Sequence, residues 1–345
     1  MNVFRPISAM LALLLLTACT SSEVPAGSDA NDASITLFAM DTVMELKAYG
    51  GNGQEALKQA SECIDHLDTL LSATNPDSEI YTANQSQGDR TAVSDDTAVL
   101  LEQALELCRD TDGVLDVSIY PAVRAWGFTT GLYQVPEEAE LAALLTNVDY
   151  TKIHLEDGFL TVPADMEIDL GAVAKGYTGD RIMDIFRSFG TSSAIISLGG
   201  NVQTLGTKPD GTLWRVAVQA PSGDGYAGVL EVDEKAVITS GGYERYFEED
   251  GQIYWHIIDP ATGWPAQNGL VSVTIISESG LLSDALSTAL FVMGKDRAID
   301  FWRSRDDFDF ILIDEDGTVT ISAGIQDSFS LYTDWMDHEL EVVSE

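Results

Sequence analysis

Five Asp-Gly pairs occur from residue 157 onward, and they constrain the fold of the chain more than any other feature. They stand at residues 157–158, 210–211, 224–225, 250–251 and 316–317. Runs rich in β-formers surround them, among them 213–220, 271–277 and 309–313. An Asp-Gly pair between two such runs is typical of a tight β-hairpin turn. We therefore expect the second half to consist mainly of antiparallel strands.

The remaining regular pattern is helical. Leu57, Ala60, Ile64 and Leu67 recur at helical spacing, which predicts an amphipathic helix over 53–72. Further helices are predicted over 96–110, 174–190 and 283–294. Ser283 or Asp284 is expected to cap the last of these, and Gly294 to close it. The combination predicts an α+β fold, a single large domain of antiparallel β-sheets flanked by helices, in one or two lobes.

The charge of the chain excludes one class of partner. Only 18 Lys and Arg oppose 56 Asp and Glu, for a formal net charge of −38. Nucleic-acid binding depends on neutralising phosphates with basic side chains. We therefore expect no nucleic-acid partner, and we interpret the acidity as that of a self-repelling, soluble surface.

The first residues predict export. Arg5 precedes a short apolar run that ends in Leu-Thr-Ala-Cys at residues 16–19. The run is too short to span a bilayer, so residues 1–19 are predicted to be a signal peptide. The four final residues resemble a bacterial lipobox, in which Cys19 is lipidated; the alternative is an ordinary signal peptide with an incidental cysteine. Residues 20–34 are expected to form a flexible tether, and 35–345 the folded domain, held on the extracytoplasmic side of the membrane.

Two further cysteines, Cys63 and Cys108, lie on the apolar faces of predicted helices. In an exported protein they could form a disulfide. Two free thiols in the protein interior are the interpretation that we prefer.

A glycine-rich stretch, Ile168 to Asp180, combines features of a phosphate site. Its Gly171 and Gly176 have the separation of a P-loop, but Tyr177 stands where that loop requires lysine. Small residues leading into a helix that carries Lys175 still suit an anion, because a helix N-terminus favours negative charge. The alternative is a tight turn packed by small side chains.

Two other stretches contain reactive groups. His256 is one of only four histidines and adjoins an Asp259-Pro260 turn. Asp284 and Thr288 are four residues apart and thus on one helical face. A carboxylate beside a hydroxyl is a plausible pair of oxygen ligands for Mg²⁺. The competing interpretations are a structural histidine and a surface helix with a solvated Asp.

Taken together, the motifs resemble the bacterial ApbE family of FAD:protein FMN transferases. They follow the family's order over most of residues 36 to 330: "AMDTVMEL", "GVLDVSIYPAVRAWGF", "EIDLGAVAKGYTGDRI", "SLGGNV", "SGGYERYF", "HIIDPATGWP" and "SDALSTALFVMG". The resemblance implies an ApbE-like, T-fold-related domain. One departure is Asp41, which stands where the family has glycine.

The resemblance also assigns site residues. It implies a Mg²⁺ ion held by the side chains of Asp284 and Thr288 and by the carbonyl of Ala172, with His256 as the residue that transfers the proton and Asp284 as a second catalytic residue. The residues that it implies for FAD contacts are Met40, Trp126, Gly127, Phe128, Asp169, Lys175 and Ile258.

The implied activity moves FMN from FAD onto a Thr hydroxyl of an exported redox protein and releases AMP. Two alternatives stay open. An FAD pyrophosphatase would use water in place of the Thr hydroxyl, and a flavin-binding lipoprotein would carry FAD without chemistry.

Overall fold

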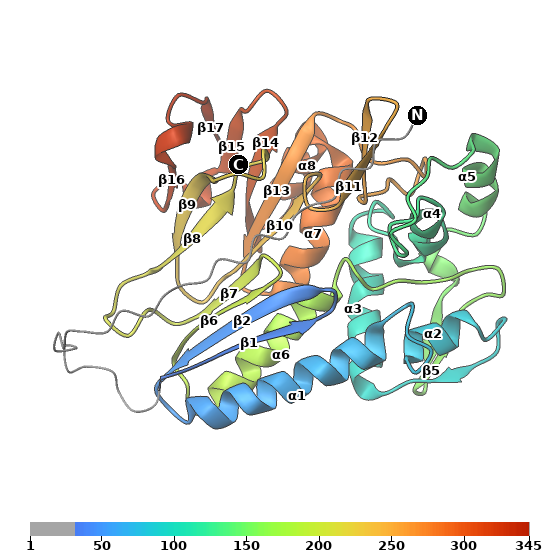
Figure 1. Cartoon of the computed structure of the whole chain (residues 1–345), viewed down its shortest axis with the longest axis horizontal. Helices are drawn as coiled ribbons and strands as arrows, with labels where there is room; N and C mark the ends of the chain where they lie inside the picture. The colour runs from blue at the N-terminus through green and yellow to red at the C-terminus, as the bar shows by residue number, and fades with distance from the viewer. Residues whose placement is uncertain (1–31, 345) are drawn as a thin grey trace, which may run out of the picture.

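A computed structural model describes residues 32–344, and Figure 1 shows its arrangement. The predicted signal peptide with Cys19, and the tether up to residue 31, lie outside the described residues. The first strand begins at Ala33, two residues before the expected domain start, because Ser34 already pairs with Lys47 in the first hairpin. No helix among the described residues is long and apolar enough to cross a membrane.

One nine-stranded sheet forms the centre of the molecule (Figure 1). Its strands, in spatial order, are β1 (Ala33–Ala39), β2 (Thr42–Tyr49), β6 (Ser193–Leu198), β7 (Asn201–Leu205), β10 (Ala236–Gly241), β13 (Leu270–Ser277), β14 (Phe308–Asp314), β15 (Val319–Ser322) and β17 (Leu340–Val343). All neighbours are antiparallel except β15 and β17, which are parallel.

Three small sheets complete the β-structure. They contain β3 (Thr91–Ala92), β5 (Phe159–Thr161) and β4 (His154–Glu156); β16 (Phe329–Leu331), β9 (Tyr226–Val232) and β8 (Trp214–Gln219); and β11 (Tyr246–Glu249) with β12 (Gln252–Trp255).

The Asp-Gly pairs behave as expected with one exception. The pairs at 157–158, 224–225, 250–251 and 316–317 each join two paired antiparallel strands. Asp157 and Asp250 have positive φ, as do the glycines that follow them, which is the backbone of a type I′ hairpin turn. The hairpin prediction at 210–211 is wrong. That turn connects β7 to β8, which belong to different sheets.

Helices pack against the main sheet through the apolar faces that the sequence pattern predicted. α1 (Gly53–Leu71) and α6 (Ala174–Ser188) lie along β1, β2 and β6, and α7 (Gly280–Met293) lies on β10 and β13 (Figure 1). The other helices are α2 (Glu79–Asn84), α3 (Asp95–Asp110), α4 (Tyr120–Ala125), α5 (Glu138–Leu145) and α8 (Lys295–Arg303), with 3₁₀ turns at 117–119, 150–152, 323–325 and 333–335. All four predicted helices are present.

The capping prediction for α7 is wrong. The helix begins at Gly280, and Ser279 is its N-cap, accepting from the Leu282 N–H at 3.2 Å. Ser283 lies one turn inside the helix, where its hydroxyl contacts Ser277 at 2.8 Å. Asp284, also inside, is therefore a buried helical residue instead of a cap. Gly294 closes the helix with φ of 77°, as expected.

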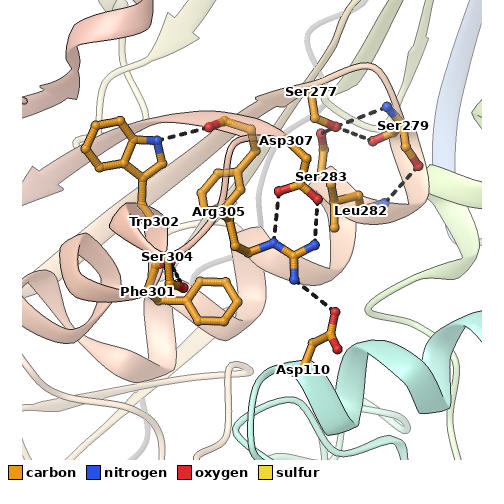
Figure 2. A network of polar contacts seen from close by, with 11 residues as sticks. Asp110, Ser277, Ser279, Leu282, Ser283, Phe301, Trp302, Ser304, Arg305 and Asp307 are labelled. Carbon is orange, nitrogen blue, oxygen red and sulfur yellow. Dashed lines mark hydrogen bonds and ion pairs between the residues drawn. The ribbon is translucent and has the colours of Figure 1, made fainter. Parts of the chain in front are cut away.

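Figure 2 shows how the start of α7 and the end of α8 are secured by polar contacts. The Arg305 guanidinium bridges Asp307 and Asp110, the latter at 2.9 Å, and so joins the end of α3 to the loop before β14. Cys63 and Cys108 are both free thiols, as expected, but only Cys108 is buried, whereas Cys63 is half-buried.

Candidate active site

The site is built on a close crossing of α6 and α7. A Cβ added to Gly176 would lie 2.2 Å from the carbonyl oxygen of Gly280, and one added to Gly280 would lie 2.5 Å from the Gly176 carbonyl oxygen. No real Cβ tolerates such distances, so the two backbones approach this closely only because both residues are glycine. The contact brings the first turn of α6 against the side chains of α7.

Asp284 lies in this crossing. It is 5% exposed, and one carboxylate oxygen accepts the Gly176 N–H at 2.8 Å while the other accepts the Asn201 amide at 2.9 Å. Burial raises the pKa of Asp284, whereas the positive charge of Lys175 and these two hydrogen bonds lower it. A buried carboxylate held by two fixed donors keeps lone pairs free for a further partner.

The carbonyl of Ala172 is the second free acceptor. α6 begins at Ala174 with Val173 as its N-cap, so Ala172 precedes the helix and its carbonyl has no intrahelical donor, while the Gly176 N–H, one of the free donors of the first turn, donates to Asp284. Within residues 32–344, no hydrogen bond to the Ala172 carbonyl is present. The turn before α6 therefore leaves one backbone oxygen without a donor from the described residues, two residues before the helix whose first turn holds Asp284.

Thr288 supplies a hydroxyl on the same face of α7, one turn after Asp284. Its Oγ1 lies 3.3 Å from Ser240 Oγ, which also contacts Ser287 Oγ at 2.8 Å. A carboxylate, a hydroxyl and a free carbonyl are hard oxygen donors of the kind that Mg²⁺ takes. Among the described residues, no three His, Cys, Asp or Glu side chains form a metal cluster, so a bound cation would depend on this mixed set, which fits Mg²⁺ chemically.

Asp169 is held at the entrance of α6 by an irregular segment. The Asn84 side chain binds both backbone groups of Ile168, at 2.9 and 2.8 Å, and the Asp169 N–H donates to the Val117 carbonyl at 2.8 Å. Burial raises the pKa of Asp169, and the Leu170 and Gly171 N–H groups and the charges of Lys175 and Arg245 oppose that shift. Lys175 is thus electrostatically coupled to Asp169 and Asp284 alike.

His256 directly follows β12 and adjoins this charged group. Its Nδ1 lies 3.2 Å from the Arg245 carbonyl oxygen. A carbonyl only accepts, so Nδ1 carries the proton and Nε2 keeps a lone pair. Partial burial, together with the charges of Arg245 and Lys175, lowers the pKa of His256 to about 4. The imidazole is therefore neutral near pH 7 and able to accept a proton at Nε2.

Aromatic side chains pack beside His256. The Phe128 ring lies 6.3 Å from the His256 ring, and Phe128 also contacts Phe247. Trp126 is fully buried against Tyr254 and Trp264, and its indole N–H donates to the Gly263 carbonyl at 2.8 Å. The Trp126 side chain is therefore a packing residue of this cluster.

The other predicted flavin-contact residues are Ile258, Gly127 and Met40. Ile258 belongs to the aromatic cluster and bridges to Pro265. A Cβ on Gly127 would lie 2.1 Å from the Leu132 carbonyl oxygen, and the residue has φ of 82°, so glycine is required for the loop that returns after Trp126. Met40 is the first residue of the β1–β2 turn, and its sulfur lies 3.8 Å from the Thr178 hydroxyl of α6.

The turn around Met40 explains the departure at position 41. Met40 and Asp41 have φ of 47° and 59°, which is the left-handed conformation that glycine or Asp adopts most readily. Asp41 is exposed and accommodates this backbone where the family has glycine.

Sequence reasoning missed the residues that hold the site together. It included Asn201 only as part of the "SLGGNV" motif, and it did not identify Ser240. Asn201 has two roles, because it directly follows the Gly199-Gly200 hairpin turn and donates to Asp284. The Ser240–Thr288 contact joins a strand to a helix 48 residues away, and no local pattern signals it.

Comparison with known proteins gives a consistent result. The ApbE family model matches residues 40–312. The FAD:protein FMN transferase of Treponema pallidum is 34% identical over 291 residues, 79% of this chain and 80% of that protein. That of Klebsiella pneumoniae is 33% identical over 304 residues, 86% of this chain and 93% of that protein.

Solved structures agree. The ApbE protein of Thermotoga maritima superposes with a TM-score of 0.81 at 31% identity, covering 86% of this chain and 99% of that one. The flavin transferase ApbE of Vibrio cholerae, solved as a histidine-to-glycine mutant, superposes with a TM-score of 0.75 at 29% identity, covering 88% and 97%.

Proposed function

The chain belongs to the ApbE family, and on that premise we propose that it is a Mg²⁺-dependent FAD:protein FMN transferase. It would bind FAD with its diphosphate at the N-terminus of α6, transfer FMN to a Thr hydroxyl of an exported redox protein, and release AMP. One observation carries the proposal: a buried carboxylate, Asp284, is held by the Gly176 N–H in the first turn of α6, at the glycine-rich entrance of that helix, in a chain of formal net charge −38. Anionic FAD would be repelled from such a site without a cation.

The donors for that cation would be Asp284, Thr288 and the Ala172 carbonyl. A bound Mg²⁺ would supply Lewis-acid stabilisation of the charge that develops on the diphosphate. Asn201 and the Gly176 N–H fix the Asp284 carboxylate, so that its orientation is set before FAD arrives. Lys175 would add positive charge where the phosphates enter, next to the helix N-terminus.

The proton of the acceptor hydroxyl would go to His256. The Arg245 carbonyl holds Nδ1, so Nε2 is the atom that would accept. Because the pKa of His256 is about 4, the base is available in its neutral form over the whole neutral range. A positioned base contributes about 10²- to 10⁴-fold to a proton-transfer step, and a pKa this far below the working pH places His256 at the lower end of that range.

Met40, Gly127, Phe128, Asp169 and Ile258 would surround the flavin nucleotide on the remaining sides. For Trp126 the support is indirect: its buried ring would stabilise the loop that carries Gly127 and Phe128. Lipid anchoring through Cys19 belongs to the same proposal and is supported by the Leu-Thr-Ala-Cys sequence alone.

The test uses residues 32–345 of the chain with FAD, Mg²⁺ and a flavin-acceptor domain that contains a target Thr. The intact mass of the acceptor is measured with and without EDTA. A gain of one FMN that requires metal and is lost in Asp284→Ala is the expected result. Free FMN and AMP without a mass gain would identify a hydrolase, and unbroken bound FAD a carrier; either would overturn the proposal.

A further inference from the structure

A carboxylate of α6 that the proposed chemistry does not use lies against the first turn of α7. Asp180 Oδ1 accepts the Gly280 N–H at 2.6 Å, and Oδ2 accepts the Leu281 N–H at 3.0 Å and the Ser279 hydroxyl at 3.2 Å. Burial raises the pKa of Asp180, and these three donors oppose the shift. Free N–H groups at a helix N-terminus favour such a negative partner.

Asp180 is more than a helix cap. α7 already has its own N-cap, because Ser279 accepts from the Leu282 N–H. Asp180 comes instead from the neighbouring helix, so that its hydrogen bonds join α6 to α7. A side chain on one helix thereby fixes where the other helix begins.

The spacing of the contacts shows what this junction controls. Asp180 is one turn after Gly176 on α6, and Asp284 is one turn after Gly280 on α7. Each helix thus contributes one glycine and one carboxylate. The Gly176 N–H donates to Asp284, the Gly280 N–H donates to Asp180, and the two glycines touch between them.

The space around the glycines is filled, so the crossing has little freedom. The Gln203 amide donates to the Gly176 carbonyl at 3.1 Å. A Cβ on Gly280 would lie 1.7 Å from the same amide nitrogen. The helices can neither rotate nor separate without breaking one of these contacts.

We propose that Asp180 is a positioning residue for the metal site, which sets the register of α7 against α6 and thereby keeps the Asp284 carboxylate on the Gly176 N–H. The inference rests on the proposed function. Without the Asp180 contacts, α7 would shift along α6, the Asp284 carboxylate would leave the Gly176 N–H, and the cation would lose the fixed position of one ligand. Outer groups that orient metal ligands typically affect metal affinity by about 10- to 100-fold.

The test measures Mn²⁺ binding by the loss of its free EPR signal, in the presence of FAD and without an acceptor. Asp180→Asn keeps the size of the side chain but replaces one acceptor oxygen with a donor that faces an N–H. We expect it to weaken Mn²⁺ binding about 10-fold or more. The matched control is Asp184→Asn, one turn further along α6, whose side chain is 70% exposed and pairs with Arg187; its Mn²⁺ affinity should equal that of the unmodified chain.

A second variant disturbs the same crossing of α6 and α7 without altering Asp180. Gly280→Ala inserts a methyl group into the crossing and must push α7 away from Gln203 and Gly176. It should weaken Mn²⁺ binding at least as much as Asp180→Asn does. Thermal unfolding of each variant confirms that the measured protein is folded, and if one variant does not fold, the other decides.

The outcomes separate the two proposals. Unchanged Mn²⁺ affinity in folded Asp180→Asn or Gly280→Ala would overturn the positioning role and leave the proposed function intact. An unmodified chain that binds no Mn²⁺ in the presence of FAD would overturn the proposed metal site, and the positioning role with it. Equal weakening in Asp184→Asn would attribute the effect to lost negative charge instead of to register.

Discussion

The two sides of the candidate site are built by different physical means. On one side, α6, α7 and β10 form a polar wall in which small residues and fixed hydrogen bonds set the position of Asp284 and Thr288. On the other side, α4, the loop after it and the β11–β12 hairpin form an aromatic wall of interlocking rings around Trp126. His256 follows the hairpin and lies next to Phe128 of the aromatic wall, and it is electrostatically coupled to Lys175 of α6.

The difference separates what each wall contributes. A hydrogen bond depends on the exact position of two atoms. Replacing one atom of the polar wall should therefore reduce the rate of transfer more than it reduces the stability of the fold. Aromatic packing depends on buried area and volume, so truncation of the aromatic wall should reduce stability first. Each of the following experiments tests this division.

The largest effect is expected in the polar wall. Asp284→Asn keeps the shape of the side chain but removes its charge and turns one acceptor into a donor. FMN transfer at saturating FAD should fall about 1,000-fold, while the unfolding midpoint stays within a few degrees. Turnover is measured by the mass of the acceptor, and Asp296→Asn on the exposed side of α8 is the control. Near-normal transfer by Asp284→Asn would contradict the role of the polar wall.

Trp126→Ala tests the aromatic wall. Removing a fully buried indole should lower the free energy of unfolding by about 3 kcal/mol or more, because a large cavity opens among Tyr254, Trp264 and Phe247. Denaturant unfolding provides the measurement. Leu132→Ala in the same loop is the control, since Leu132 is 78% exposed and should cost little. A stable Trp126→Ala with a large loss of transfer would reverse the assignment.

The His256 side chain should affect the rate of transfer without affecting metal binding. His256→Gln should reduce transfer about 100-fold with unchanged Mn²⁺ affinity, whereas His154→Gln on exposed β4 should have no effect. In the unmodified chain the acid limb of the rate profile should lie near pH 4, well below 6.5, because the neutral form persists to that pH.

The low pKa of His256 also makes the free energy of unfolding depend on pH. Between pH 4 and 6.5 the unfolded chain binds a proton at this residue and the folded chain does not, so stability should rise with pH across that window. An acid limb at pH 6.5 that His256→Gln leaves in place would show that another group is the base.

The smallest effect is expected at the rim of the aromatic wall. Tyr133 is 44% exposed and stacks on Phe247 with ring centroids 5.2 Å apart. Tyr133→Ala should lower the free energy of unfolding by about 1 kcal/mol, as measured by denaturant unfolding. Tyr133→Phe should retain that stability, since the stack does not need the hydroxyl. A loss as large as that of Trp126→Ala would show that exposure is a poor guide to packing here.

The sequence predicted local structure well, because local structure has local causes. Helical spacing identified α1 and α6, and Asp-Gly pairs identified most of the hairpins. It failed where a decision depended on distant contacts. Asp210-Gly211 has the same two residues as the other pairs, but the strand after it joins another sheet, and Ser279 replaces Ser283 as the cap because Asp180 of α6 secures an earlier start.

The site followed the same division. The spacing of Asp284 and Thr288 predicted a shared helical face, but not that Asn201 and Gly176 would hold the carboxylate. Trp126 is expected to contact flavin, which stays a prediction, but the sequence did not show that its ring is fully buried. A sequence pattern reports which residue types are present, whereas the depth at which each one lies is a property of the assembled chain.

The two hydrogen bonds between Asn84 and Ile168 determine how slowly this segment can open. Ile168 belongs to no strand or helix, yet both of its backbone groups are bonded, and the next N–H, of Asp169, is bonded to Val117. Amide exchange at Ile168 and Asp169 therefore requires α2 and the 117–119 turn to separate from this segment, an opening far slower than the nanosecond motion of a surface loop. Asp169, whose carboxylate is expected to contact the flavin nucleotide, thus has a backbone that is released only when these elements separate. Its segment opens slowly although it has no regular secondary structure.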